Sequence, residues 1–560
     1  MISFTLSMAL ICCGGLAALF FWRQFLLMKT MAVGFIGIGC ALGLIDALTK
    51  LLHPGTYAVS WKYLNLFSFS FQIDGLSAFF LASIHTVSLL AVIYSFHYLS
   101  DGQKALRSAV SYLFFALLIA SMALVVTATN LITFMFSWEI MSLASFFLVI
   151  YDHESVENRQ AGYLYFVFSH VGAMFILVAF GIFYGNTGSF MFASGSTMSD
   201  AAKLTILILA FVGFGSKAGV FPFHVWLPHA HPAAPSHISA VMSGVMIKTG
   251  IYGIVRLYAS LGLHTPLFGE IVLAAGMISG ILGVVYALGQ HDIKRLLAYH
   301  SVENIGIILI GIGMLGVSFG NPIMAVLGFS GGLLHVLNHS IFKSLLFMGA
   351  GVVIQKTGTR TIDMLGGLLK HMKITGITFL VGSLAISGLP PFNGFVSEFF
   401  IYLGGFRGAA LDRTAFVMSI MAIVSLAIIG GLALACFTKV VGVVFQGEPR
   451  HSDAVAMDEK GPTMLLPMLV LAGLCLIIGV FPRLFIHLAL KAIPVSALGY
   501  GRIPMEPFMA ITANITLAAT VFFVILAAIM ALRLVFYKDK TIRRGGTWAV
   551  SYTHMTMQTK

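Results

Sequence analysis

Apolar runs of about 20 residues recur from one end of this chain to the other. A run of this length lets a helix cross a hydrocarbon core of roughly 30 Å. Because lipid offers the backbone no hydrogen bonds, such runs suit membrane-spanning helices. Hydrophobic residues form 59% of the 560 residues and charged residues 9%, which excludes an ordinary soluble domain. The sequence therefore predicts an all-α polytopic membrane protein.

The apolar runs predict about fifteen transmembrane helices. Their expected spans are 3–22, 31–51, 75–97, 109–127, 129–150, 160–184, 203–223, 237–260, 267–289, 294–317, 323–354, 374–404, 413–445, 463–490 and 509–537. The first span follows no charged segment and no clear Ala-x-Ala cleavage signal, so we expect a retained helix instead of a signal peptide.

Basic residues are concentrated in alternate loops. If the N-terminus lies outside, the inner loops and the tail carry Arg23, Lys29, Lys104, Arg107, Arg159, Lys294, Arg295, Lys356, Arg360, Lys370, Lys373, Arg450, Lys460, Lys538, Lys540, Arg543 and Arg544. The outer loops carry fewer, so the positive-inside rule predicts an outside N-terminus and a cytoplasmic C-terminus. These loops and their contact with anionic lipid explain the net charge of +12, so we expect no nucleic-acid partner.

The five cysteines are scattered through apolar runs and form no Cys-x-x-Cys pair: Cys12, Cys13, Cys40, Cys436 and Cys475. This pattern argues against an iron–sulfur, Ni–Fe or zinc–thiolate site in the chain. Any redox centre is expected in another subunit.

Charged side chains stand within several of the long apolar runs: Glu139, Lys217, Lys248, Lys343 and Glu398. An ionised group at the centre of a bilayer costs roughly 2.5–3.5 kcal/mol on insertion scales. Residues found there in spite of this cost commonly mark a path for ions. We therefore expect these five to take part in proton translocation.

Two segments rich in glycine and proline interrupt membrane-length runs. Residues 219–224 follow Lys217, and residues 388–393 precede Glu398. Paired breaks of this kind are typical of transporters built from repeats, because unwound backbone at depth must face protein or water. Two ordinary proline kinks are the alternative, and the charged residue beside each break favours the functional interpretation.

Glu139 is the single acid in its run, and Lys217 is the natural cation for it. We expect the two groups to approach and withdraw, because the distance to an opposite charge changes the affinity of each for a proton. A structural ion pair is the alternative. Lys248 lies too deep to reach the membrane surface and could pass a proton onward.

His335, His339 and Lys343 recur every four residues, so they share one helix face and can line one aqueous file. Histidine is a competent relay near neutral pH. The two histidines could also chelate zinc, but the motif lacks the glutamate of a His-Glu-x-x-His site and its surroundings are apolar. We predict no metal there.

Further titratable residues form two groups. His224, His229, His231 and His237 share a segment with four prolines, which we interpret as a rigid loop beside the proton path, with His231 as a candidate relay, and not as a metal site. His300 and Glu303 lie one helical turn apart. They either add proton sites or pair near the membrane interface, and both interpretations stay open.

At these residues the chain resembles a known family. Residues 213–256, 295–306, 334–343 and 389–395 are together similar to the proton-pumping antiporter-like subunits of respiratory complex I and its relatives. The resemblance covers most of residues 70–445. Residues 299–306 and 544–548 are most similar to the large membrane subunits of group 4 hydrogenases, of the hydrogenase-4 component B and formate hydrogenlyase type.

The resemblance implies a fold of two inverted five-helix repeats with broken helices. It divides the chain into N-terminal flanking helices (1–108), a first antiporter-like bundle (109–260), a second bundle (267–445), and C-terminal helices with a basic cytoplasmic tail (446–560). Some long members end in a lateral helix and a further span, an element that we expect to be missing, truncated or supplied elsewhere here.

The resemblance also assigns roles by position. It matches Glu139 to the glutamate of helix five, Lys217 to the lysine of broken helix seven, Lys248 to the lysine of helix eight, His335, His339 and Lys343 to the central relay, and Glu398 to the second broken helix. Members carry lysine or glutamate at that last position, so the exit-side chemistry is left open.

The expected function is that of a proton-translocating, or sodium-translocating, membrane subunit of a group 4 hydrogenase or complex I-like redox complex. The chain itself would be non-catalytic and hold no cofactor, and partner subunits would carry Ni–Fe and iron–sulfur centres. We expect it in a bacterial or archaeal cytoplasmic membrane, with membrane and peripheral redox subunits as partners. The alternatives are a module of a multisubunit cation/proton antiporter and a structural anchor.

Overall fold

The computed structural model describes residues 1–53, 55, 57–63, 67–263, 265–318, 321–411, 413–446, 450, 459, 461–494 and 506–537. Within these ranges, 14 helical segments are long and apolar enough to cross a membrane. The prediction of an all-α polytopic membrane protein is thereby confirmed. The basic tail expected near residues 538–560, with the 544–548 motif, lies outside the described residues.

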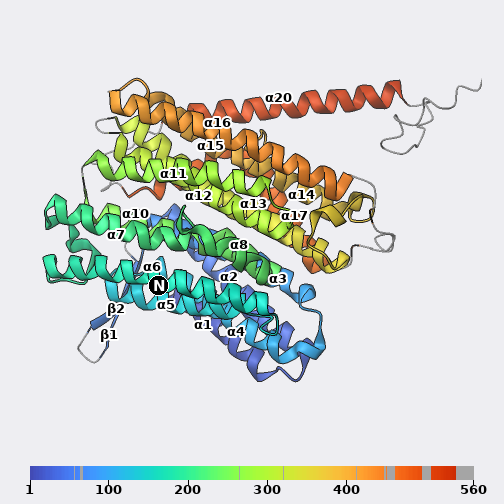
Figure 1. Cartoon of the computed structure of the whole chain (residues 1–560), viewed down its shortest axis with the longest axis horizontal. Coiled ribbons are helices and arrows are strands. Elements are labelled where there is room, and N and C mark those ends of the chain that lie inside the picture. The colour runs from blue at the N-terminus through green and yellow to red at the C-terminus, as the bar shows by residue number, and fades with distance from the viewer. Residues whose placement is uncertain are drawn as a thin grey trace, which may run out of the picture.

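The helices run side by side along the longest axis of the molecule, from the N-terminal helices on one side to α16 and α20 on the other (Figure 1). Those of the first half are α1 (Ile2–Phe20), α2 (Phe25–Leu52), α3 (Gly75–Tyr98), α4 (Ala105–Val125), α5 (Leu131–Val149), α6 (Val156–Thr187), α7 (Asp200–Ala218), α8 (Leu227–Ala233), α9 (Ser236–Val241) and α10 (Lys248–Leu261).

The second half continues in the same manner. Its helices are α11 (Pro266–Leu288), α12 (Ile293–Val317), α13 (Pro322–Thr357), α14 (Lys373–Ile386), α15 (Asn393–Gly408), α16 (Arg413–Val441), α17 (Pro462–Val480), α18 (Pro482–Lys491) and α20 (Glu506–Phe536). Helices α12 and α13 are enclosed by protein over nearly all of their length, whereas α20 lies along the outer edge and is mostly exposed (Figure 1).

One element was not predicted. Strands β1 (Tyr57–Tyr63) and β2 (Phe67–Ile73) form an antiparallel hairpin in a segment between two predicted spans, with Tyr57 opposite Ile73. Aromatic and β-branched residues alternate with polar ones along both strands, a pattern that favours strands. The backbone of Gln72 donates to the carbonyl of Thr127, which fixes the hairpin to the turn between α4 and α5. We call this end of the molecule the hairpin end.

Both predicted breaks are present. Helix α7 stops at Gly219, whose φ of +81° is left-handed and favours glycine. The second break separates α14 from α15 within the span expected at 374–404: Gly388 has a φ of +64°, and Pro390 and Pro391 follow it. The span expected at 463–490 is also two helices, α17 and α18, which divide at Pro482.

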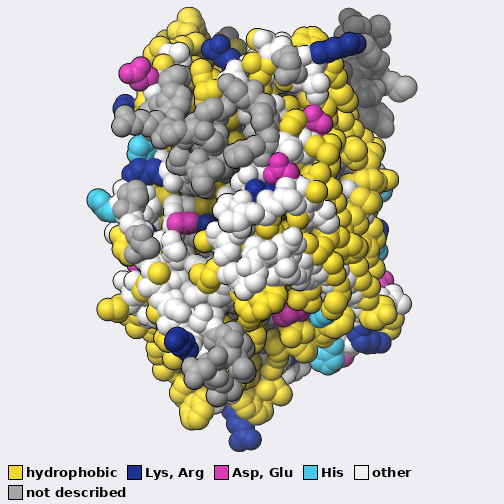
Figure 2. Space-filling view, turned by 90° about the vertical axis from the view of Figure 1, so that its left-hand side faces the viewer, with side chains coloured by type: hydrophobic (Ala, Val, Ile, Leu, Met, Phe, Trp, Pro, Cys, Tyr) yellow, Lys and Arg dark blue, Asp and Glu magenta, His cyan; other side chains and the backbone are white. Residues whose placement is uncertain are grey.

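At the hairpin end, α3 and α10 are joined by a charged pair. Arg256 donates to both carboxylate oxygens of Asp74, at 2.5 and 2.8 Å, and Asp74 also accepts from the backbone N–H of Ser77 at the start of α3. Burial acts to raise the pKa of Asp74, but the Arg256 guanidinium and these hydrogen bonds lower it to about 2. Figure 2 looks onto this end and shows hydrophobic side chains along most of its right-hand margin.

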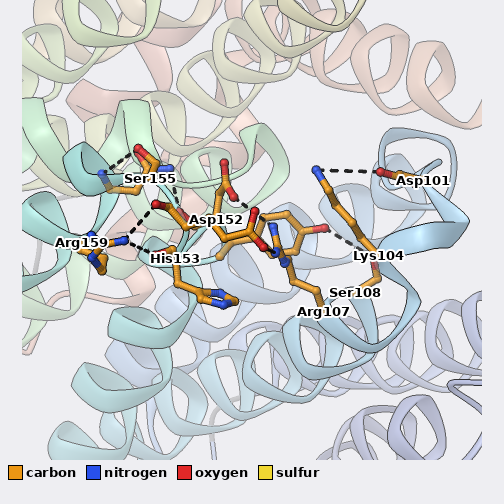
Figure 3. Close-up of polar contacts among 11 residues, drawn as sticks. Asp101, Lys104, Arg107, Ser108, Asp152, His153, Ser155 and Arg159 are labelled. Atoms are coloured by element: carbon orange, nitrogen blue, oxygen red, sulfur yellow. Dashed lines mark hydrogen bonds and ion pairs between the residues drawn. The ribbon is translucent and has the colours of Figure 1, made fainter.

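At the opposite end, α4 is held to the turn between α5 and α6. Arg107 lies 3.0 Å from Asp152 and 2.6 Å from Glu154, and Arg159 bonds to the carbonyls of the same turn (Figure 3). We call this the clasp end.

Candidate functional site

Lys217 occupies the last turn of α7, where the partial negative charge of a helix C-terminus favours a cation. Its Nζ donates to the hydroxyl of Ser142 on α5 at 3.1 Å and to that of Tyr165 on α6 at 2.5 Å. The same nitrogen lies 4.8 Å from the ring centre of Tyr165. The buried ammonium is therefore held by hydroxyl dipoles and an aromatic face.

Glu139 lies on α5, and its side chain is 35% exposed. Its carboxylate is 3.6 Å from Nε2 of His170 on α6. Among the described residues no ion pair joins Glu139 to Lys217, and the hydrogen-bond partners of Lys217 are neutral hydroxyl groups. His170 was not predicted, because nothing in the sequence indicates which face of α6 meets Glu139.

Lys248 begins α10, directly after a wide helical turn at Met242–Met246. Such a turn shifts the backbone bonding pattern, and the Lys248 ammonium donates to the carbonyl of Ser243. Gly250 packs against Ala218, the neighbour of Lys217, because a Cβ on Gly250 would lie 3.1 Å from the Cβ of Ala218. Lys248 thus lies beside the end of α7, and it interacts electrostatically with Lys343 on α13.

His335, His339 and Lys343 are fully buried on α13. The two imidazole centres are 6.4 Å apart, consistent with the shared face that their spacing predicts. Both ring nitrogens of His339 and the Nζ of Lys343 have no hydrogen-bond partner among the described protein atoms. Buried polar groups without a partner need water or another hydrogen-bonding group.

His335 is anchored on both sides. Nε2 lies 3.0 Å from Oδ1 of Asn304, and Nδ1 lies 2.9 Å from Oγ of Ser397 on α15. Asn304 donates its own amide to the carbonyl of His300, so its Oδ1 must accept from Nε2–H. The Ser397 hydroxyl can donate either to Nδ1 or to the carbonyl of Gly394, 2.9 Å away. In the second case a hydrogen bond between Nδ1 and Ser397 requires a proton on both ring nitrogens of His335.

His300 and Glu303 form a hydrogen-bonded pair on α12, and both are fully buried. The structure thus pairs the two side chains, and their role as added proton sites stays a prediction. Glu303 interacts electrostatically with Lys343 and Glu398. Cys436 of α16, which the sequence pattern did not single out, lies beside His300 and Lys343.

Glu398 is buried on α15, one and a half turns after the second break. A Cβ on Gly388 would lie 2.6 Å from its Oε2, so the carboxylate packs directly on the break. The predicted association of Glu398 with broken backbone is therefore present in space as well as in sequence.

The four histidines near the first break do not gather. His224 stacks on Phe221, and His237 lies edge-on to Tyr98. His231 is fully buried without a partner for either ring nitrogen in the described part of the chain, and it interacts electrostatically with Lys248, Lys294 and Lys343. No group of three or more His, Cys, Asp or Glu side chains in the described ranges is arranged to hold a metal ion.

The chain is similar to known proteins in both sequence and fold. The family described as "NADH:quinone oxidoreductase/Mrp antiporter, TM" matches residues 128–428, and "NADH-Ubiquinone oxidoreductase (complex I), chain 5 N-terminus" matches residues 61–107. Hydrogenase-4 component B of Escherichia coli (strain K12) is 41% identical over 453 residues, covering 79% of this chain and 67% of that protein. Formate hydrogenlyase subunit 3 of the same organism is 34% identical over 543 residues, covering 94% of this chain and 84% of that protein.

Among solved structures, a chain of the membrane-bound sulfane sulfur reductase, an archaeal respiratory membrane complex, superposes with a TM-score of 0.79 at 27% identity. The match covers 96% of this chain and 85% of the other. The sequence and the fold agree, and the protein belongs to the NADH:quinone oxidoreductase/Mrp antiporter family of membrane proteins.

Proposed function

We propose that this chain is the ion-translocating membrane subunit of a group 4 hydrogenase or a related complex I-like redox complex. The observation that carries the proposal is the series of buried titratable side chains that links the two broken helices. It runs from Lys217 through Lys248 and the α13 residues His335, His339 and Lys343 to Glu303 and Glu398. Residues with this cost in a membrane mark ion paths.

The transfer step begins at Lys217. A signal from a partner subunit changes the distance between Glu139 and Lys217, and the separated arrangement leaves the ammonium with neutral partners only. Lys217 then loses its proton toward Lys248, because no nearby anion retains it. The hydroxyl of Tyr165, which also bonds Ser145, holds the lysine for this step.

The second half carries the proton onward. Lys248, His339 and Lys343 interact electrostatically, so a charge on one changes proton affinity at the others. Glu303 and Glu398 lie beyond Lys343 and pass charge outward, with His300 and His231 as further relays. Water between the unbonded nitrogens of α13 completes the path.

The relatives indicate the assembly. Hydrogenase-4 component B and formate hydrogenlyase subunit 3 are named for hydrogen-metabolising complexes, so we infer peripheral partners that carry Ni–Fe and iron–sulfur centres. We place the N-terminus outside and the C-terminus in the cytoplasm of a bacterial or archaeal cell. The second candidate is a module of a multisubunit cation/proton antiporter, because the matching family description includes Mrp antiporters.

The test compares the replacement of Lys217 with the replacement of a second buried lysine on α7. In inverted membrane vesicles that contain the whole complex, Lys217→Met should reduce donor-driven ion uptake at least about tenfold, which is the effect of losing roughly 1.4 kcal/mol at the limiting step. The control is Lys203→Met on the same helix, which removes a lysine 3.8 Å from Asp200 near the helix start. Undiminished uptake in Lys217→Met vesicles would refute the path.

The partners are identified separately by gentle purification of the tagged chain and mass spectrometry. Co-purified Ni–Fe and iron–sulfur subunits would support the redox complex. Recovery of small antiporter subunits alone, with sodium-dependent transport, would favour the second candidate.

A further inference from the structure

We propose that a pocket at the clasp end binds the headgroup of an anionic phospholipid. The pocket lies between the start of α6, the helix α8 and the start of α12, and encloses about 750 Å³. Its charged wall contains Arg159, Arg295, Arg360 and the exposed His229, and its apolar wall contains Leu164 and Pro228. We call it the arginine pocket.

The carboxylates in this pocket are already engaged. Asp292 accepts from Arg360 at 2.6 Å and from the backbone N–H groups of Lys294 and Arg295, where it caps α12. Glu157 lies 3.6 Å from the same Arg360 and is largely exposed. The two carboxylates more than neutralise Arg360, and the three arginines and two carboxylates leave the pocket a net charge of +1. The arginines without a carboxylate partner are the other two.

Arg295 and Arg159 are left to bind an anion. No carboxylate of the described residues lies within ion-pair distance of either, and the buried Nε of Arg295 has no hydrogen-bond partner there. One guanidinium nitrogen of Arg159 bonds to the carbonyls of His153 and Glu154 (Figure 3), which fixes the side chain and leaves its other N–H groups free. Two guanidinium groups with free N–H donors, of which Arg159 is held by the turn, suit a phosphate, which accepts paired N–H bonds.

The surface below the pocket indicates a lipid instead of free phosphate. From the arginine pocket toward the middle of the bilayer, α6 exposes Tyr163, Val167, Val171, Met174 and Val178. These residues are three or four apart, so they form one stripe along the helix. Tyrosine favours the headgroup level, and Tyr163 is 70% exposed. The stripe offers acyl chains a surface that begins at the phosphate site.

The depth of the pocket agrees with this occupant. Its charged residues lie at the first turns of α6 and α12 and just after α13, which are ends of membrane-length helices. Basic pockets between helices at this level are suited to anionic headgroups. A bound headgroup would join α6 to α12 and to α8, the segment that follows the break at Lys217.

The experiment measures lipid retention by native mass spectrometry of the intact purified complex. The complex is incubated with nanodiscs of phosphatidylcholine that contain either cardiolipin or phosphatidylglycerol, and with phosphatidylcholine alone. We expect the anionic lipids to be retained and phosphatidylcholine to be lost. Arg295→Gln should lower retention about fivefold, the effect of one basic side chain near a charged headgroup.

The control is Arg23→Gln, which removes an exposed arginine that stacks on Trp22 between α1 and α2. It should leave retention unchanged. Arg159→Gln serves as a second variant, and an unaltered melting temperature shows that either pocket variant is folded. Excess inorganic phosphate should not displace the lipid.

Four results would overturn the proposal. The first is equal retention of phosphatidylcholine, and the second is retention that neither arginine variant lowers. The third is binding by the isolated chain that disappears in the complex, since a partner subunit would then cover the arginine pocket. Displacement by inorganic phosphate alone would likewise assign the site to a free anion.

Discussion

The ammonium group of Lys217 depends on neighbours that are neutral. Its two hydrogen-bond acceptors, Ser142 and Tyr165, come from different helices, and both lie in the protein interior. A change in the charge near this site would therefore act on Lys217 without competition from a bound carboxylate. This arrangement makes the hydroxyl of Tyr165 a positioning group for the proposed transfer.

Tyr165→Phe removes that hydroxyl and keeps the ring. A hydrogen bond to a charged group contributes about 1.5–3 kcal/mol, so we expect donor-driven ion uptake to fall roughly tenfold or more. The matched control is Tyr163→Phe, two residues earlier on α6 but 70% exposed. Initial uptake rates in inverted vesicles test the difference, and equal rates in the two variants would contradict the role of Tyr165.

Ser397→Ala tests the link between His335 and the second broken helix. It removes the partner of Nδ1 and leaves His335 with Asn304 alone. We expect slower ion uptake and a loss of about 1–3 kcal/mol of stability, because a buried polar group becomes unbonded. Ser383→Ala, which loses only a bond to the carbonyl of Phe379 on its own helix, should be close to wild type. Uptake that is unaffected in Ser397→Ala would remove Ser397 from the path.

At the scale of elements, the sequence was most informative where structure is local. The shared face of His335, His339 and Lys343 follows from helix periodicity, and the two breaks follow from glycine and proline chemistry. The partners of these residues, such as Tyr165, His170 and Asn304, come from other helices, and a single sequence does not specify which helices meet. The hairpin at residues 57–73 was missed because its two strands lie between much stronger helical patterns.

The turn after Lys217 gives a prediction for α7. Gly219→Ala places a Cβ 1.9 Å from Leu227 and forces a left-handed backbone on alanine, so we expect a loss of about 1–3 kcal/mol in stability. Gly181→Ala on α6 meets nothing within 4 Å and should be neutral or slightly stabilising. Thermal melting in detergent distinguishes the two, and a stable Gly219→Ala would show that the turn is not strained.

The link between α3 and α10 predicts a dependence on acid. Asp74 has a pKa of about 2 in the folded protein, below its ordinary value of 3.8, so its stabilising effect is present above about pH 4 and is lost as the pH falls toward 2. Because the side chain is 37% exposed, we expect only about 1 kcal/mol from it. Asp74→Asn should have a lower melting temperature than wild type at neutral pH. The difference between the two melting temperatures should become smaller in acid. The control variant Asp101→Asn, at an exposed carboxylate, should have the melting temperature of wild type at both pH values. If the melting temperature of Asp74→Asn changed with pH in the same way as that of wild type, the stabilising effect of the Asp74 charge would be excluded.

For the whole molecule, the two ends make the orientation testable. If the hairpin end lies outside, a membrane-impermeant maleimide should label Ser60→Cys in intact cells, since Ser60 is exposed on β1. Gln103→Cys at the clasp end should be labelled only after permeabilisation. The parent chain measures the background of its own cysteines, and the reverse labelling pattern would place the clasp end outside.

The enclosure of α12 and α13 has an electrical consequence. Mobile ions in solution weaken interactions between exposed charges beyond roughly 10 Å at 0.1 M salt, but they have little effect inside a protein. The charges along α13 therefore interact with one another strongly, and the salt in the surrounding solution screens these interactions very little. The electrostatic coupling between Lys248 and Lys343 would keep its strength when the salt concentration in the cell changes. Contacts between exposed charges, such as those of the arginine pocket, would weaken as the salt concentration rises.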